Sequence, residues 1–300
     1  MSELFHIVSD GSLDLPVATT KEKDITVVPF YVSFDDEHYY RENVDLDIRD
    51  FYQQMVDKKG VYPKSSMPST QDYVDAFLPW VEKKEPIICI CITAKFSGSM
   101  QSAMTAKEIV LEDHPDAMIT IIDCTFNTVC QGLYVLEAVK MRDAGMSYEA
   151  TINRLHEIKA TGRIFFTVGD MEYLKHGGRI GAVAAVAGSV LGIRPIIKLE
   201  KGEIFPAGIG RGRKRTFDKS LELLIEYLEK NQYAPEDVSI CIGYGYDPEE
   251  AKECQKVALE VLHSKGFPFD DVPLYQIGAT IGVHTGPYPL GFGIVEKAMK

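Results

Sequence analysis

Hydroxyl side chains gather after three apolar stretches of the sequence, and their chemistry suits the binding of an anion. The stretches 4–8, 86–93 and 118–123 have the composition of buried strands, and a pair of hydroxyl residues follows each. The pairs are Ser9 with Ser12, Ser97 with Ser99, and Thr125 with Thr128. Because the carboxyl ends of parallel strands meet at one edge of a sheet, we expect the pairs to converge there. Each hydroxyl alone is typical of a helix cap or a turn, whereas the group, with helix N-terminal N–H groups, predicts an anion site.

Two further segments place polar side chains beside glycine. In Lys175-His-Gly-Gly-Arg-Ile180, Arg179 fits either a cation close to a ligand or the solvated end of a helix. His284 lies between Gly282 and Gly286, where we expect an irregular backbone with the imidazole as its only large polar group. A lone histidine is often structural, but this setting favours contact with a ligand.

The order of the predicted elements indicates an α/β protein of two domains. Over residues 1–160, strand, polar loop and helix recur three times, which is typical of a parallel, Rossmann-like sheet with helices on its faces. The element order changes near residue 160, so we predict an N-terminal α/β domain over 1–160 and a C-terminal α/β domain over 161–300. The other predicted elements include strands at 25–34, 194–200, 203–207, 237–244 and 272–277, a turn at 64–69, and a glycine-dense segment at 278–287.

The composition is that of an acidic globular protein. The 300 residues carry 44 acidic and 32 basic side chains, a formal net charge of −12. Such an excess of carboxylates argues against a general nucleic-acid binder and against adhesion to anionic membranes. The six cysteines form no C-x-x-C pair, the N-terminus lacks the features of a signal peptide, and no apolar run is long enough for a membrane span, so we expect a soluble, cytoplasmic protein. One compact basic run, Arg211-Gly-Arg-Lys-Arg215, interrupts the acidic background.

Six short motifs, taken in order, resemble those of the DegV family over essentially the whole chain. They are Ser9-Asp-Gly-Ser-Leu-Asp-Leu15, Ser65-Ser-Met-Pro-Ser69, Phe96-Ser-Gly-Ser99, Tyr173-Leu-Lys-His-Gly-Gly-Arg-Ile180, Ile193-Arg-Pro-Ile-Ile197 and Ile277-Gly-Ala-Thr-Ile-Gly-Val-His-Thr-Gly-Pro287. Each motif is weak by itself, but the ordered set is specific. The resemblance implies a parallel-sheet domain followed by an α/β domain with a mixed sheet, and a ligand bound between them.

The resemblance further implies a bacterial protein that binds a long-chain fatty acid, such as palmitate, stearate or oleate, with no metal or other cofactor. By position, the carboxylate contacts fall on Ser65, Ser97, Ser99 and His284, and the residues near the head group are Arg179 and Thr280. Ser65 and Ser99 stand where the family usually has threonine, and Met67 replaces a usual glutamine. In the better understood members, a separate kinase subunit phosphorylates the bound carboxylate, which implies a kinase partner and a role in phospholipid synthesis.

Two other segments gain an interpretation from the resemblance. Arg211, Arg213 and Lys214 become a candidate docking face for the kinase subunit, although a solvated loop before a helix explains them equally well. The Gly/Ala-rich segment 181–192 suits the wall of a narrow acyl tunnel, and it suits close helix packing to the same degree.

The residues also admit other functions. A serine hydrolase or acyltransferase would use Ser97 or Ser99 with His284, but the sequence contains no G-x-S-x-G elbow and no carboxylate is clearly assigned to orient the histidine. A nucleotide-binding kinase is disfavoured because neither G-x-x-x-x-G-K-[ST] nor G-x-G-x-x-G occurs. A metal enzyme is disfavoured because the seven histidines lack ligand spacing.

Overall fold

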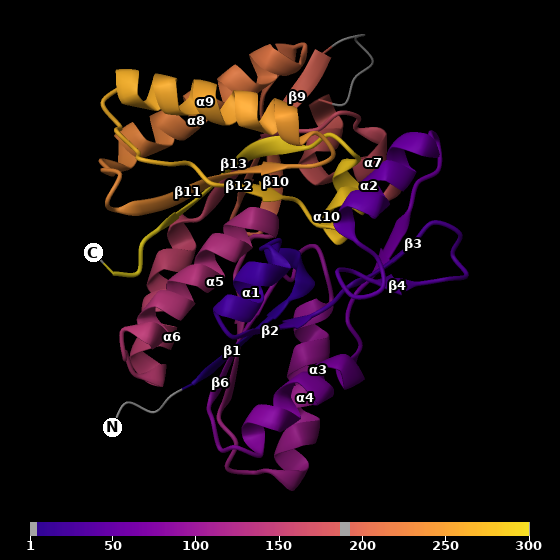
Figure 1. The fold of residues 1–300 in the computed structure, drawn as a ribbon, viewed down its shortest axis with the longest axis vertical. Coiled ribbons are helices and arrows are strands. Elements are labelled where there is room, and N and C mark those ends of the chain that lie inside the picture. The colour runs from indigo at the N-terminus through magenta and orange to yellow at the C-terminus, as the bar shows by residue number, and fades with distance from the viewer. Residues whose placement is uncertain (1–4, 187–192, 300) are drawn as a thin grey trace.

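The computed structural model describes residues 5–186 and 193–299, which form two larger sheets and one small sheet (Figure 1). The larger sheets contain residues from different parts of the chain: the first is built from residues before 124 and the second from residues after 162. This arrangement confirms the predicted α/β class with a parallel sheet followed by a mixed sheet.

The first sheet is parallel throughout and has the order β2-β1-β6-β7. Its strands are β1 (His6–Asp10), β2 (Ile25–Val28), β6 (Ile87–Cys91) and β7 (Ile119–Asp123). Every residue of β1 and β6 is buried, which explains why these strands consist of apolar runs rather than alternating residues. The helices α3 (Thr70–Val81) and α4 (Ser99–Asp113) pack on one face, and α1 (Val17–Glu22) follows β1.

A small antiparallel sheet interrupts this domain, and the sequence did not indicate it. The predicted strand 25–34 is two strands, β2 and β3 (Tyr31–Ser33), which separate at Pro29, where the backbone N–H needed for pairing is missing. The predicted turn at 64–69 begins with β5 (Lys64–Ser66), which pairs with β3. The strand β4 (Tyr40–Arg41) completes this sheet, and α2 (Ile48–Asp57) follows it.

The second sheet is mixed, with the order β10-β9-β8-β13-β11-β12 and a single parallel pair, β11 with β12. Its strands are β8 (Arg163–Thr167), β9 (Ile193–Glu200), β10 (Glu203–Arg211), β11 (Val238–Tyr244), β12 (Leu274–Gln276) and β13 (Leu290–Glu296). The strand β13 was missed because Gly291 and Gly293 weaken its sequence pattern. A side chain at Gly291 would collide with Phe165 and Phe166 of β8, so close approach of the strands requires glycine there.

One helix, α5 (Thr128–Asp143), lies between the two larger sheets (Figure 1). Twelve of its sixteen residues are buried, so it lacks the polar face of a surface helix. Its apolar residues join side chains from β1, β6, β8, β9 and β13 in one continuous core. The opposite face of the mixed sheet is covered by α8 (Arg213–Asn231) and α9 (Pro248–Ser264).

The shorter elements connect these layers. They are α6 (Tyr148–Ile158), α7 (Glu172–His176), α10 (Ala279–Thr285) and the 3-10 helices η1 (Gly11–Leu13), η2 (Lys159–Thr161) and η3 (Gly181–Val186). The irregular backbone expected around His284 was wrong, because these residues form α10. Within the described residues, no helix combines the length and the apolar character that a membrane span requires.

Several of the hydroxyl residues that follow strands do converge, but they meet in a buried network around Asp10 at the end of β1. The Asp10 carboxylate accepts hydrogen bonds from the Ile92 N–H at 2.9 Å, the Ser99 hydroxyl at 2.8 Å and the Gln131 amide at 2.8 Å. Ser9 and Ser12 extend the network through Gln131. Burial outweighs these donors and raises the pKa of Asp10 to about 6.

We predict that Asp10 makes the folded state less stable as the pH rises. Because its pKa is raised from 3.8 to about 6, the folded protein holds this proton more tightly than the unfolded chain does. The stabilisation is complete below about pH 4 and is lost as the pH rises through about 6, a change of about 3 kcal/mol. Urea unfolding from pH 4 to 8 should show a loss of stability that is smaller in Asp10→Asn than in the wild type by about 3 kcal/mol, because other buried acids with raised pKa values keep their own contributions. The exposed Asp113→Asn is the control; equal slopes in all three proteins would contradict the prediction.

Candidate functional site

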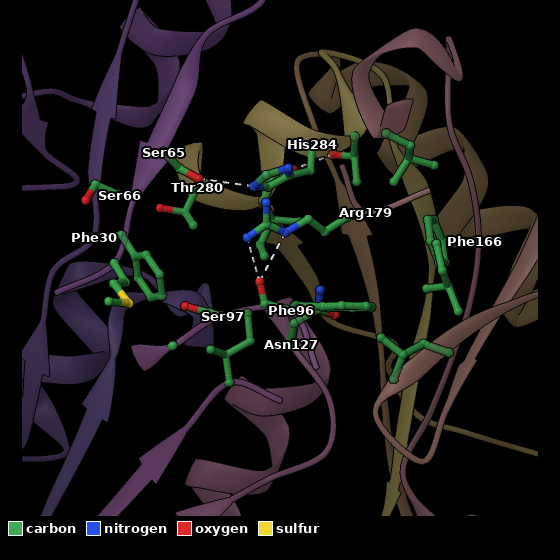
Figure 2. A pocket seen from close by; sticks show the side chains of 18 residues that line it. Phe30, Ser65, Ser66, Phe96, Ser97, Asn127, Phe166, Arg179, Thr280 and His284 are labelled. Carbon is green, nitrogen blue, oxygen red and sulfur yellow. Dashed lines mark hydrogen bonds between the residues drawn. The ribbon is translucent and has the colours of Figure 1, made fainter. Parts of the chain in front are cut away.

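A cavity of about 260 Å³ lies where the carboxyl end of the parallel sheet, the small sheet and the mixed sheet meet (Figure 2). Its polar lining residues are Ser65, Ser66, Ser97, Asn127, Arg179, Thr280, His284 and Thr285. Its apolar lining residues are Phe30, Met67, Ile92, Phe96, Phe166, Leu174, Leu199, Ile204 and Ile281, and Gly98 also lines it. In Figure 2, Phe166 lies on the side of the cavity opposite Ser65 and Ser66, so hydroxyl groups and an aromatic ring face each other across the space.

The centre of the polar end is a pair formed by Ser65 on β5 and His284 on α10. The Ser65 Oγ and the His284 Nε2 lie 3.1 Å apart, which is a hydrogen bond whose direction depends on the tautomer. The other ring nitrogen, Nδ1, is buried without a hydrogen-bond partner in the described part of the chain. Burial and the nearby Arg179 lower the pKa of His284 to about 4, so the imidazole is neutral at neutral pH.

A buried carboxylate fixes the helix that carries His284. The side chain of Glu42, which follows β4, accepts hydrogen bonds from the Ala279 N–H at 2.6 Å, the Thr280 N–H at 3.1 Å and the Thr280 hydroxyl at 2.7 Å. These are the first donors of α10, which would otherwise be unsatisfied. Thr280, which the resemblance places near a ligand head group, lines the cavity, but the proton of its hydroxyl is already directed at Glu42.

The two serines of the Ser97-Gly-Ser99 turn lie in different places. Ser97 lines the cavity, and its Oγ accepts a hydrogen bond from the Ser99 N–H at 3.2 Å, so its own proton stays available to a ligand. Ser99 is fully buried outside the cavity, where its hydroxyl lies 2.8 Å from Asp10 and 2.6 Å from the Tyr73 hydroxyl. The structure thus does not bring Ser99 together with Ser65, Ser97 and His284.

Arg179 connects the two halves of the molecule at the cavity. Its Nε and Nη2 donate to the Phe96 carbonyl oxygen at 3.1 and 2.8 Å (Figure 2). Its Nη1 donates to the Gly177 carbonyl oxygen at 2.7 Å. The guanidinium therefore holds the turn before α4 against the segment after α7. It lines the cavity as a charged group whose donors are largely engaged with backbone oxygens.

The basic run lies away from the cavity. Arg211 ends β10 and is exposed, as is Lys214 in the first turn of α8. Arg213 is half-buried, forms an ion pair with Glu250 and donates to the Tyr288 carbonyl oxygen at 2.7 Å. No residue of the run is among the described lining residues. Of the Gly/Ala-rich segment 181–192, residues 187–192 and the side chains of 185 and 186 lie outside the described part of the chain, and residues 181–184 are not among the lining residues.

The apolar wall and Asn127 were missed from the sequence. Leu199 and Ile204 come from neighbouring strands of the mixed sheet, and their sequence context is that of any buried strand. Asn127 follows β7 beside Thr125 and Thr128, so the rule that directed attention to the hydroxyls at strand ends would also have found it if amides had been included.

A family model described as "Uncharacterised protein, DegV family" matches residues 4–297. A DegV domain-containing protein of Clostridium perfringens is 32% identical over 285 residues, which is 94% of this chain and 94% of its own length. A solved structure of a fat acid (stearic acid)-binding protein from Eubacterium ventriosum is 43% identical, with a TM-score of 0.92 over 98% of this chain and 99% of that chain. DegV, a fatty acid binding protein from Bacillus subtilis, is 27% identical, with a TM-score of 0.81 over 99% of this chain and 100% of that chain.

We predict that Gly177 is required for the position of the His284 ring. A Cβ atom at residue 177 would collide with Nδ1 of His284, although the backbone of Gly177, with φ −72°, accepts alanine without strain. In Gly177→Ala the imidazole should move toward solvent, and its pKa, measured by NMR titration, should rise from about 4 toward its ordinary value of 6.5.

The matched control is Gly98→Ala, which also adds a methyl group to the cavity wall. Its Cβ would meet only the end of the Met67 side chain, which is flexible and half-exposed and can move aside. The His284 titration should therefore be unchanged in Gly98→Ala. A His284 pKa that stays at its wild-type value in Gly177→Ala would disprove the assignment.

Proposed function

The chain belongs to the DegV family, and from this premise we propose that it binds one long-chain fatty acid in the cavity. The carboxylate would contact Ser65, Ser97 and His284, and the acyl chain would extend along the apolar wall. Two similar structures support the ligand class, since their descriptions name a stearic acid-binding protein and a fatty acid binding protein.

The observation that supports the proposal most is that one cavity combines hydrogen-bonding groups around Ser65 and His284, its polar end, with a wall of apolar side chains. Each buried methylene contributes on the order of 0.8 kcal/mol, so a long acyl chain gains much from the apolar wall. A carboxylate needs hydrogen bonds to leave water, and the polar end offers the hydroxyls of Ser65 and Ser97 and the imidazole of His284. The neutral imidazole of His284 has one N–H; on Nε2 it can donate to the ligand carboxylate or to Ser65, and the Ser65 hydroxyl then keeps its own proton for the ligand.

We further propose that a separate kinase subunit uses the bound acid. The carboxylate oxygen would attack the γ-phosphorus of ATP, the bond from that phosphorus to ADP would break, and an acyl phosphate and ADP would form. Neutral donors suit this step, because a carboxylate held by hydroxyls and a neutral imidazole keeps more of its nucleophilic charge than one paired with a cation. The binding protein itself would supply no catalytic group, and the product would serve phospholipid synthesis in the cytoplasm.

Two domains, 1–160 and 161–300, remain our proposed division, with the ligand between them. The lining residues come from both: Ser65 and Ser97 precede the boundary, whereas Arg179 and His284 follow it. Binding would then join the domains through one carboxylate. The core around α5 already connects them, so we regard them as parts of one packed unit.

The geometry favours this proposal over a serine hydrolase. His284 is hydrogen bonded to Ser65, whereas the Ser97 Oγ is engaged by the Ser99 N–H. The Nδ1 atom of His284, which a triad carboxylate would orient, has no partner among the described residues. Stoichiometric labelling of Ser97 by an activated-ester probe would restore the hydrolase hypothesis.

We predict that the purified protein carries or takes up one long-chain fatty acid. Native mass spectrometry followed by lipid extraction should detect it, and titration with stearate, palmitate or oleate should saturate at one molecule per chain. Ser97→Ala and His284→Ala should each weaken binding by roughly 10- to 100-fold, because each removes a hydrogen bond to a charged group. Ser264→Ala, at the end of α9, is the control. An empty protein that ignores all three acids would refute the proposal.

We predict that the kinase subunit docks on the exposed part of the basic run. The double substitution Arg211→Glu and Lys214→Glu reverses two exposed charges away from the cavity, and it leaves the ion pair of Arg213 in place. A kinase-coupled assay should lose phosphotransfer at least tenfold while stearate affinity stays unchanged. The control reverses the charge of two other exposed lysines, Lys230 and Lys265. They lie at the C-terminal ends of α8 and α9, whereas the basic run lies at the N-terminal end of α8. Loss of both functions, or of neither, would rule out docking at this face.

A further inference from the structure

Asn127 occupies the junction of two neighbouring cavities. It lines the large cavity together with Ser65, Ser97 and His284, and it also lines a smaller one of about 40 Å³. The smaller cavity continues between α5 and the mixed sheet, and its lining shares Phe166, Ile281 and Thr285 with the large cavity. Ser65, Ser97 and His284 are not among the described lining residues of the smaller cavity. Asn127 therefore lies between the proposed carboxylate site and the smaller cavity.

The Asn127 amide is free to bind a ligand. No hydrogen bond joins it to another group in the part of the chain that the structure describes, and it does not cap α5. The other polar side chains of the smaller cavity are already engaged: Thr285 donates to the Ile281 carbonyl oxygen at 2.9 Å, and Thr128 donates to Asp14. The remaining lining of that cavity is apolar.

The backbone holds this amide in place. Asn127 is extended, with φ −147° and ψ −176°, between Thr125 and Thr128, which adopt positive φ values of 63° and 47°. Such values are unfavourable for β-branched residues and persist only where the surroundings enforce them. Here the Thr125 N–H donates to Asp123 at 2.7 Å, and Thr128 is held by Asp14. The side chain of Asn127 is therefore presented to the cavity by a constrained turn.

An ordinary acyl chain is a poor match for this position. A methylene lying against the amide would displace water from a donor and an acceptor and return no hydrogen bond. An oxygen on the chain would satisfy both, since a hydroxyl donates to Oδ1 and accepts from Nδ2. Sites built to hydrogen bond a substrate hydroxyl discriminate strongly against the analogue that lacks it.

We propose that Asn127 makes this protein selective for a fatty acid that carries a hydroxyl group part of the way along its chain. The inference rests on the proposed fatty-acid binding and specifies its ligand. Asn127 is then a specificity-determining residue, because it contacts the chain and takes no part in holding the carboxylate.

The test compares stearate with a series of monohydroxystearates that together place the hydroxyl at every position of the chain. Isothermal titration of the wild type should find one position, or two adjacent ones, that bind about tenfold or more tighter than stearate. In Asn127→Leu, which has a similar size and no amide, this preference should vanish, and stearate should bind as tightly as to the wild type or tighter. Thr285→Val, which removes an engaged hydroxyl from the same junction, should change the affinities of both acids equally.

The outcomes separate the two proposals. Failure of the wild type to bind stearate or any hydroxystearate would refute fatty-acid binding itself. Binding of stearate with no preferred hydroxyl position would overturn the role of Asn127 alone. A parallel loss of both ligands in Asn127→Leu, with a lowered melting temperature, would mean that the residue is structural and would equally overturn the inference.

Discussion

The candidate site depends on one buried carboxylate, that of Glu42. Only 3% of this residue is exposed, and its oxygens satisfy the first donors of α10. Its own backbone N–H donates to the Phe30 carbonyl oxygen at 3.0 Å, between β2 and β3. Glu42 therefore ties the small sheet, which carries Ser65, to the helix that carries His284. The 3.1 Å contact between those two side chains follows from this connection across more than 200 residues of sequence.

A second buried carboxylate, that of Asp14, lies close to this connection. A side chain at Gly278, the N-cap of α10, would collide with both Glu42 and Asp14, so the two acids approach the same glycine. Burial and their mutual repulsion raise the pKa of Asp14 well above its ordinary value, and burial raises the pKa of Glu42. Two such groups are not both ionised at low energetic cost. Glu42 accepts the hydrogen bonds of α10, and Asp14 accepts one from the Thr128 hydroxyl.

Local patterns in the sequence were sufficient for the parallel sheet but not for the small sheet or α10. Buried strands such as β1 and β6 can be recognised in the sequence as apolar runs. In contrast, β5 consists of three polar residues that form a strand because they pair with β3. The glycines of 278–286 suggested an irregular backbone, yet α10 forms because Glu42 supplies its cap from far along the chain. Ser99 shows the same limit: a hydroxyl at this position suited a ligand contact, but at the start of α4 it points away from the cavity and donates to Asp10. The sequence shows which residue type stands at a position, whereas tertiary contacts determine where its side chain points.

The electrostatics of the cavity follow from these contacts more than from net charge. An overall charge of −12 disfavours an incoming carboxylate, and the one cation in the described lining, Arg179, has most of its donors directed at backbone oxygens. Hydroxyls and a neutral imidazole remain, and such donors are effective only where water is excluded and their directions are fixed. Rigid support is therefore a condition for binding an anion at this site. The capped helix α10, the glycine at 177 that lets His284 approach, and the hydrogen bonds of Arg179 to the Phe96 carbonyl oxygen meet that condition with a single cation in the described lining.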